Sequence, residues 1–228
     1  MQYEEILKRL KSLANPAIAA GMARFGSRPK KALGISAPNL RQLAKEIGRD
    51  HRLALRLWDS GIHEARILAS LIDEPEKVTE TQMERWVKDF DSWDVCDACC
   101  CNLFDKTPVA YQKAAAWSKR KEEFVKRAGF ALVAYLAVHD KKAKDEAFIR
   151  FLPMIKPASS DERNFVKKAV NWALRQIGKR NVALNRLAIQ TAKDIHAMDS
   201  KTARWIAADA LRELTGEKIK KRLQDKQS

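Results

Sequence analysis

Apolar residues recur three or four positions apart along most of the chain, whereas strict alternation of apolar and polar residues is nearly absent. The first pattern is typical of helices that bury one face, and the second of half-buried strands. We therefore predict an all-α protein whose helices are joined by short loops. The expected helices span residues 2–13, 16–24, 38–48, 51–59, 62–73, 79–90, 93–105, 108–119, 122–139, 144–155, 161–178, 182–197 and 201–215.

Three segments of this pattern echo one another. Residues 127–132 resemble residues 168–174, about 41 positions later, and residues 203–207 follow at a similar interval. This period suits HEAT-like helical pairs, which cannot bury their apolar faces alone and therefore stack. We expect an α-α superhelix of such pairs, with a basic concave face formed by the inner helices. A compact irregular bundle is the alternative.

Length and composition predict one domain. A chain of 228 residues can bury roughly 70% of its unfolded surface and needs no disulfide or metal to hold its core together. The 8 glycines and 7 prolines are about half of the average share, which disfavours turn-dense β folds. We expect a single domain over residues 1–228, with residues 217–228 as a charged, frayed tail.

The cysteines and the first residues indicate a compartment. All four cysteines lie between residues 96 and 101, too close together to tie distant segments by disulfides. The N-terminus carries two glutamates where a signal peptide would be basic, and no apolar run is long enough to span a membrane. We expect a cytoplasmic protein with reduced thiols, without a membrane partner.

Charge narrows the partners. Lys and Arg number 44 against 29 Asp and Glu, a net charge of +15. This excess favours a polyanion, most simply nucleic acid, although it can also serve solubility alone. The longest irregular stretch, residues 26–37, carries Arg28, Lys30 and Lys31. We expect these three side chains to contact a nucleic-acid backbone.

The expected helix over 93–105 carries the first candidate chemistry. Trp93 and Asp97 are four residues apart and therefore share one helical face. An indole face beside a carboxylate suits a developing cation, because both attract positive charge. The alternative is that Trp93 belongs to the core and that Asp97 and Asp94 are solvated first-turn acids.

The neighbouring thiols resemble a metal motif but fail its geometry. Cys96, Cys99 and Cys100 can share a helical face, whereas Cys101 points about 140° away from Cys96. We therefore interpret them as core cysteines. The four histidines are scattered and have no ligand-spaced cysteine or carboxylate partners, so we predict no metal site, no histidine-based hydrolase and no cofactor.

Two further helices offer groups that suit nucleic acid. Arg127 adjoins small residues, so its guanidinium can reach over a close-packed surface to a phosphate. Trp172 has Lys168 and Arg175 about one turn to either side, an interleaving of aromatic and basic residues. A helix with the tryptophan on its buried face and the lysines on its wet face has the same sequence.

Taken in order, several segments resemble the AlkD-type DNA alkylation repair glycosylases, a bacterial and archaeal family of HEAT-like repeat proteins. The resemblance spans nearly the whole chain and rests on the order and spacing of its motifs rather than on any one of them. The motifs are Met-Ala-Arg-Phe at 22–25, Leu-Gly-Ile at 33–35 with Pro38 and Arg-Gln-Leu at 41–43, Ser-Trp-Asp-Val-Cys-Asp at 92–97, Arg-Ala at 127–128 and Lys-Ala-Val-Asn-Trp-Ala-Leu-Arg at 168–175.

The resemblance implies an activity and a site. Proteins of this family wrap duplex DNA and hydrolyse the N-glycosidic bond of cationic N3- or N7-alkylated purines, without a metal and without flipping the base into a pocket. Their catalytic aspartate falls on Asp97, the two indoles that flank the deoxyribose on Trp93 and Trp172, and the phosphate-contacting arginine on Arg127. Phe25 stands where the family has a backbone-contacting tyrosine.

We therefore expect a monomeric DNA glycosylase that acts on duplex DNA carrying alkylated bases, and that is associated with the nucleoid when bound. Ser92 and Tyr135 depart from the family pattern, which has an aromatic residue and a lysine at these places. Two other classes stay open. One is a HEAT-like module that binds damaged or branched nucleic acid without chemistry, and the other is a protein-binding solenoid whose charge serves solubility.

Overall fold

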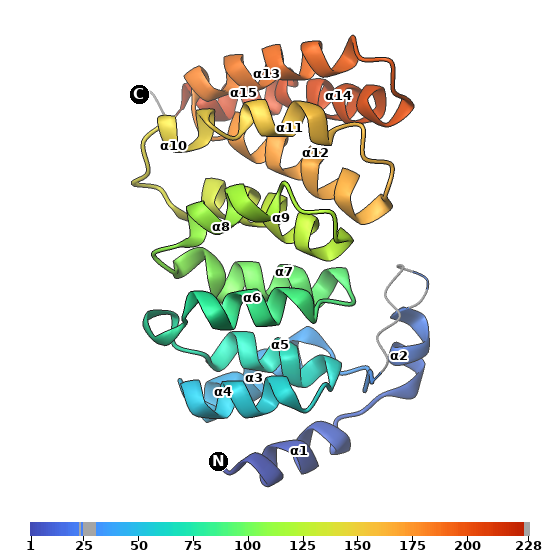
Figure 1. The fold of residues 1–228 in the computed structure, drawn as a ribbon, viewed down its shortest axis with the longest axis vertical. Coiled ribbons are helices and arrows are strands. Elements are labelled where there is room, and N and C mark those ends of the chain that lie inside the picture. Colours follow the sequence, from blue (N-terminus) through green and yellow to red (C-terminus); the bar gives the residue numbers. More distant parts are fainter. Residues whose placement is uncertain (23, 25–30, 226–228) are drawn as a thin grey trace. The chain divides into compact units, whose positions relative to one another are not determined.

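The computed structural model describes residues 1–22, 24 and 31–225, and within these residues it contains helices and no strand (Figure 1). The all-α prediction is therefore confirmed. The α-helices are α1 (Tyr3–Ser12), α2 (Pro16–Met22), α3 (Ala37–Ile47), α4 (His51–Asp59), α5 (His63–Ile72), α6 (Glu80–Lys88), α7 (Trp93–Asn102), α8 (Ala110–Trp117), α9 (Glu123–His139), α10 (Glu146–Ile149), α11 (Leu152–Ala158), α12 (Asn164–Gly178), α13 (Val182–His196), α14 (Lys201–Leu214) and α15 (Glu217–Gln224). Two short 3-10 helices, η2 (Pro75–Lys77) and η3 (Phe104–Lys106), lie between them.

The chain forms two compact units, the first over residues 1–108 and the second over residues 109–228. No change in composition marks the division, which falls between η3 and α8. Among the described residues, none of the helices combines the length and the apolar character that a bilayer span requires.

The first unit is built around α5, which packs against α3, α4 and α7. Two buried tryptophans fill its interior. The rings of Trp58 and Trp86 stack with centroids 3.9 Å apart, and the Trp58 indole N–H donates to the Asp89 carboxylate at 2.8 Å. This bond satisfies the polar end of Trp58 without exposing its ring.

A buried carboxylate on α5 fixes the approach to α3. Glu64 is only 2% exposed, and it accepts hydrogen bonds from the backbone N–H groups of Leu33, Gly34 and Ile35 at 2.8, 2.6 and 3.3 Å. Three donors offset much of the cost of burying the charge, because bonds to an ionised acceptor are stronger than neutral ones. Residues 33–35 are thereby tied to α5.

The second unit is a series of helical pairs. Helix α9 packs against α8 and α12, and α12 packs in turn against α13 and α14. The three echoing segments of the sequence lie on α9, α12 and α14, so each marks the same helix of a successive pair. Gly129 allows α8 and α9 to approach closely, because a Cβ there would lie 2.8 Å from the Ser118 Cα.

Three parts of the expected pattern differ. The helix expected over 144–155 is divided into α10 and α11, because Pro153 has no backbone N–H to continue α10 and instead lies in the first turn of α11. Helix α12 begins at Asn164 rather than near 161, since the Asp161 carboxylate binds Arg163 and Lys126 instead of capping. Residues 217–224, expected within a frayed tail, form α15.

Helix α15 forms because its sequence is amphipathic. Ile219 and Leu223 are four residues apart and are 7% and 3% exposed, so they share one buried side. The charged residues between them occupy the opposite side and face solvent. Ile219 and Leu223 therefore form a short apolar stripe within a highly charged segment.

Candidate nucleic-acid site

The predicted catalytic residues of the first unit lie on the accessible side of α7. Trp93, Asp94 and Asp97 are half-buried, whereas Val95, Cys96, Cys99 and Cys100 are fully buried. At about 100° per residue, the half-buried positions 93, 94, 97, 98 and 101 cover one arc of the helix and the buried positions cover the opposite arc. The structure thus places the Trp93 indole and the Asp97 carboxylate one turn apart on the same side.

The thiols form the buried back of α7. Cys96, Cys99 and Cys100 pack in the interior, whereas Cys101 is half-buried. Burial raises the pKa of the Cys99 and Cys100 thiols well above the usual range, which keeps both neutral. They act as small apolar side chains that hold α7 against its neighbours.

A histidine of α5 supports the same side of α7. His63 is 3% exposed, and its Nε2 lies 2.9 Å from Asp94 Oδ2. Burial alone would raise the pKa of the Asp94 carboxyl, but the hydrogen bond and charge of His63 outweigh it and hold the pKa below its usual range. Asp94 is therefore ionised at neutral pH and held in place beside Trp93.

Sequence reasoning missed the partners of two histidines. His63 pairs with Asp94, 31 residues away, and His51 Nδ1 lies 2.7 Å from Oδ1 of the buried Asp73. Neither spacing is that of a ligand motif. For His63 the signal in the sequence is the 31-residue spacing, which also separates Trp58 from its partner Asp89. His51 and Asp73 are 22 residues apart and do not share it.

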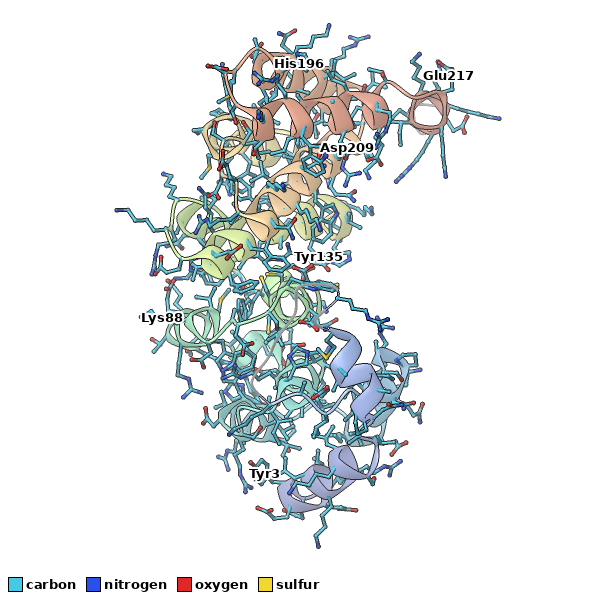
Figure 2. All side chains as sticks on the ribbon, turned by 90° about the vertical axis from the view of Figure 1, so that its right-hand side faces the viewer. Tyr3, Lys88, Tyr135, His196, Asp209 and Glu217 are labelled. Atoms are coloured by element: carbon cyan, nitrogen blue, oxygen red, sulfur yellow. The ribbon has the colours of Figure 1, made fainter. Side chains whose placement is uncertain are left out.

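In the second unit, Trp172 lies on the polar side of α12. Lys168, Trp172 and Arg175 fall on one stripe of the helix, and none of the three is fully buried. Tyr135, labelled in Figure 2, lies on α9. Its ring meets the Trp172 ring edge-on, with centroids 4.8 Å apart. With the Gln176 amide oriented to accept, the Trp172 indole N–H donates to its oxygen at 3.0 Å. Tyr135 and Gln176 therefore fix the indole.

The residues predicted to contact phosphate differ in the groups that they bind within the protein. Arg127 is 6% exposed and donates from Nη1 to the Phe165 carbonyl at 2.8 Å. Arg175 pairs with Glu213 at 2.7 Å and lies 3.5 Å from Asp209. Lys168 is exposed, and so is Lys31. The backbone carbonyl of Lys31 accepts from the His63 backbone N–H at 2.9 Å.

The remaining predicted contacts, Phe25, Arg28 and Lys30, lie outside the described residues. A further aromatic residue was not singled out as a site from the sequence. Trp205 on α14 is 45% exposed, and the Lys167 ammonium lies 5.5 Å from its ring centroid. A cation over an exposed indole has the composition of a nucleic-acid contact. The sequence signal for Trp205 was the third repeated segment, residues 203–207, in which a tryptophan recurs beside an arginine.

The fold and these residues define a class, the HEAT-like repeat proteins with aromatic and basic side chains on exposed helix faces. The chain belongs to the DNA alkylation repair enzyme family, whose family model matches residues 6–214. No curated protein matches the chain.

One solved structure agrees with the class. A member of a new family of proteins related to the HEAT-like repeat DNA glycosylases, with affinity for branched DNA structures, matches with a TM-score of 0.81 over 98% of this chain and 96% of that chain, at 20% identity. At that identity the match shows the fold alone, and it confirms the HEAT-like repeat. A designed armadillo repeat protein in complex with a (KR)4 peptide matches at 13% identity over 82% of this chain and 79% of that chain, with a TM-score of 0.38, too low to carry an argument.

Proposed function

We propose that this protein is a DNA glycosylase that hydrolyses the N-glycosidic bond of cationic N3- or N7-alkylated purines in duplex DNA. The observation that carries the proposal is the accessible side of α7, where Trp93 and Asp97 lie one turn apart on a fully buried back. Membership in the DNA alkylation repair enzyme family supports the substrate class. We expect the protein to act in the cytoplasm, on the nucleoid.

The chemistry requires little from the protein. An alkylated purine carries a positive charge, so it leaves as a neutral base when the bond between its nitrogen and C1′ breaks and takes the bonding pair with it. The sugar becomes an oxocarbenium-like cation. Water then forms the new bond to C1′ and gives up a proton, which the Asp97 carboxylate accepts. Asp97 thus stabilises the cation before it acts as base.

The Trp93 indole assists by contact with the sugar. Its ring face attracts a cation, and this attraction strengthens as positive charge develops. Asp94 adds a second fixed negative charge beside Trp93, because its pair with His63 keeps it ionised. In this proposal Asp97 is the catalytic residue, and His63 and Asp94 position α7.

The test measures release of alkylated base from duplex DNA treated with a methylating agent. We expect wild-type protein to release 3-methyladenine or 7-methylguanine above the spontaneous rate, and Asp97→Asn to slow release by about 10²-fold or more. Asp91→Asn is the matched control, since Asp91 is exposed just before α7 and the charge change is the same. No release by excess wild-type protein would overturn the enzymatic function.

A second function is favoured by one observation. Arg127 and Arg175, two of the expected phosphate contacts, already bind a carbonyl and two carboxylates within the protein. The structural relative at 20% identity has affinity for branched DNA. A protein that only binds such DNA, and hydrolyses no glycosidic bond, needs no preformed lesion site. This function predicts tighter binding to a four-way junction than to a duplex, together with no base release by wild-type protein.

A further inference from the structure

A regular series of paired side chains joins α12 to α14 in the second unit. The Asn171 amide donates to the Asp209 carboxylate at 2.7 Å, and Arg175 donates to the Glu213 carboxylate at 2.7 Å. The partners in each pair are 38 residues apart in the sequence. Successive pairs stand four residues apart, about one helical turn, on both helices. The two pairs therefore fix the register of α12 against α14.

The next pair towards the start of both helices has a different composition. In the same register, Lys167 lies opposite Trp205, and its ammonium lies 5.5 Å from the centroid of the indole ring. Trp205 is 45% exposed, whereas Trp58, Trp86 and Trp117 are at most 1% exposed. An exposed ring thus stands where the two other pairs have a carboxylate. Lys167 keeps its charge, because a ring face attracts a cation without neutralising it.

Further cations flank this indole. Lys201 lies one turn before Trp205 on α14, and Lys168 follows Lys167 on α12; Lys201 and Lys168 are both exposed. None of the three lysines forms an ion pair with a residue that the structure describes. Ala208, about one turn after Trp205, is also exposed, and its small side chain stands where a long one would cover part of the ring. These five residues are called the Trp205 surface.

Two carboxylates near the Trp205 surface are already paired. Asp209, one turn after Trp205, lies 3.5 Å from Arg175. Asp199, just before α14, lies 3.5 Å from Arg204. Both α12 and α14 begin beside this surface, so their dipoles present positive ends there. The surface therefore combines an exposed aromatic ring with an excess of positive charge.

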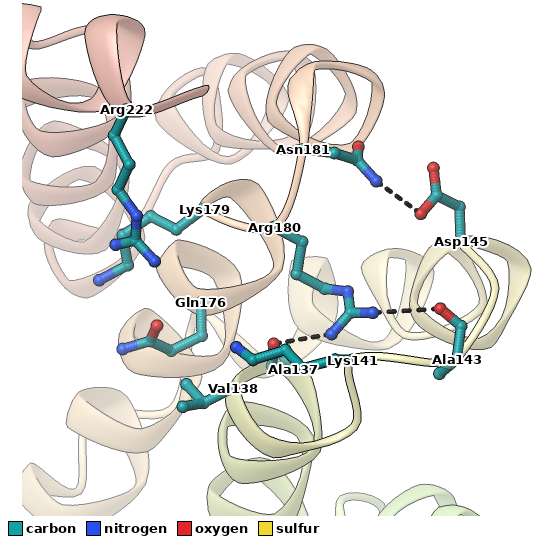
Figure 3. Close-up of a pocket in the computed structure, with 10 residues that line it drawn as sticks. All are labelled: Ala137, Val138, Lys141, Ala143, Asp145, Gln176, Lys179, Arg180, Asn181 and Arg222. Atoms are coloured by element: carbon teal, nitrogen blue, oxygen red, sulfur yellow. Dashed lines mark hydrogen bonds between the residues drawn. The ribbon is translucent and has the colours of Figure 1, made fainter. Parts of the chain in front are cut away.

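A basic pocket at the ends of α9 and α12 differs from this surface (Figure 3). There Arg180 donates to the carbonyls of Ala137 and Ala143 at 2.8 and 3.1 Å. The Asn181 amide donates to the Asp145 carboxylate at 2.7 Å. These bonds join the turn between α12 and α13 to α9 and to the segment before α10. The guanidinium in this pocket is thus used to hold helices together.

We infer that the Trp205 surface binds single-stranded DNA by stacking an unpaired base on the indole. Every nucleobase has a face that stacks on an aromatic ring, and the adjoining phosphates attract the flanking lysines. The Lys167 ammonium lies near the outer limit of about 6 Å for its attraction to the ring, so a phosphate can draw it away. One contact of each kind then forms at the same nucleotide.

The composition of the surface favours a nucleic acid over a protein partner. Protein interfaces are depleted of lysine and have an apolar centre made of several side chains. Trp205 is the one large apolar side chain that is exposed among the described residues of α12 and α14, and lysines surround it. The inference does not rest on base release, because it concerns undamaged, unpaired DNA and residues that the proposed chemistry does not use.

The test compares Trp205→Ala with Leu187→Ala. Leu187 on α13 is 40% exposed, so the control removes a large apolar side chain of similar exposure. Trp205→Phe retains an aromatic ring. Binding of labelled oligothymidine to the full chain is measured by fluorescence anisotropy, and thermal unfolding verifies that each variant folds. A second strand of the same length carries abasic sites, so it has the same phosphates but no bases to stack.

We expect Trp205→Ala to bind oligothymidine about tenfold more weakly than wild type, because one stacked base contributes about this much. Leu187→Ala should bind as wild type does, and Trp205→Phe should recover most of the affinity. On the abasic strand, Trp205→Ala and wild type should bind equally. The inference is overturned by equal binding of oligothymidine to wild type and Trp205→Ala, by an equal loss on the abasic strand, or by no binding to wild type.

A second arm tests the phosphate contact. Lys167→Gln should reduce the slope of log K against log salt for oligothymidine by about 0.7, the contribution of one phosphate on a single strand. Lys218→Gln makes the same change of charge at an exposed position of α15, after the other end of α14, and should leave the slope unchanged. Equal slopes for the two variants would overturn the phosphate contact of Lys167.

A third arm distinguishes unpaired from paired DNA. A forked duplex with two single-stranded arms should lose affinity on Trp205→Ala, whereas a blunt duplex of the same number of nucleotides should not. An equal loss on both would place the indole against paired DNA and overturn the stacking of an unpaired base.

Discussion

Asp94 owes its ionisation to a histidine from another helix. His63 holds its pKa below the usual range against the effect of burial. Because the folded pKa lies below the unfolded value of about 3.9, the carboxylate stabilises the fold above that pH, and this contribution is lost as the pH falls through the folded pKa. The pair therefore makes stability sensitive to acid.

This sign gives a prediction for Asp94→Asn. We expect the variant to have a lower free energy of unfolding than wild type at pH 7, and the difference to shrink towards about pH 2. Urea unfolding at both pH values measures it. Asp91→Asn serves as the control, since it makes the same change of charge at an exposed position. A difference that stays constant with pH would assign the effect to packing rather than charge.

Substitution of Arg127 tests whether this residue has a structural role or a role in DNA binding. Its guanidinium is buried and donates to the Phe165 carbonyl, so removing it leaves a part-buried acceptor without this donor. We expect Arg127→Ala to lower the free energy of unfolding by about 1–3 kcal/mol, measured by urea unfolding. Lys168→Ala, at an exposed position of α12, should change it by less than about 0.5 kcal/mol. Equal effects would place Arg127 at the surface.

At the level of single residues, helical spacing predicted that Trp93 and Asp97 share one face of α7, but it missed the contact between Asp94 and His63. The four-residue interval between Trp93 and Asp97 is enough to place both on one face of α7. Nothing local connects Asp94 with His63, because that pair depends on the packing of α5 against α7. Likewise, the burial of Arg127 follows from α12 lying across α9.

The helices of each unit repeat at their own interval. In the first unit, Trp58 and His63 bind aspartates 31 residues further along the chain. In the second unit, Arg127, Asn171 and Arg175 bind partners 38 residues further along. A shared offset among these bonds is what stacked helical pairs produce, since each of them joins one helix to the equivalent helix of the next pair.

Close approach of α8 and α9 gives a prediction for Gly129→Ala. The new methyl group would press on the backbone of Ser118, so we expect the free energy of unfolding to fall by about 1–3 kcal/mol or more. Gly21→Ala on α2 is the control, because nothing lies within 4 Å of a Cβ there and alanine favours helix. Thermal or urea unfolding measures both. Equal stability of the two variants would contradict the close approach.

Element boundaries were predictable where a local group decides them. Ser36 accepts from the Asn39 N–H at 3.4 Å, and Asn15 accepts from two N–H groups of α2, as their places before proline indicate. The start of α12 was not predictable in this way. Asp161 binds Lys126 of α9, a tertiary contact that removes it from the helix end. Local capping signals fail where a distant cation offers a stronger partner.

Over the whole molecule, the excess of positive charge is only partly used internally. Some cations join neighbouring helices, as Arg175 and Lys179 do with Glu213, whereas others such as Lys168 are exposed. The net charge of +15 predicted a polyanionic partner, but net charge alone could not indicate which cations are already paired. That division depends on tertiary packing.

The exposed cations give a prediction for DNA binding. We expect affinity for undamaged duplex DNA to fall steeply with salt, with a slope of log K against log salt steeper than about −3, because each contacted phosphate contributes about −0.9. Fluorescence anisotropy of labelled duplex at several salt concentrations measures the slope. A slope near zero would assign the positive charge to solubility and remove DNA as a partner.

The stacked pair of indoles in the first unit also has an optical consequence. The Trp58 and Trp86 rings stack with their centroids 3.9 Å apart, so their electronic transitions couple. If the two transition moments are skewed within the parallel ring planes, the pair gives an excitonic couplet in circular dichroism. The second unit has its own tryptophans, Trp117, Trp172 and Trp205, outside this pair. Loss of the couplet therefore reports melting of residues 1–108 alone, and its comparison with loss of the helical signal reveals whether the two units unfold as one cooperative system.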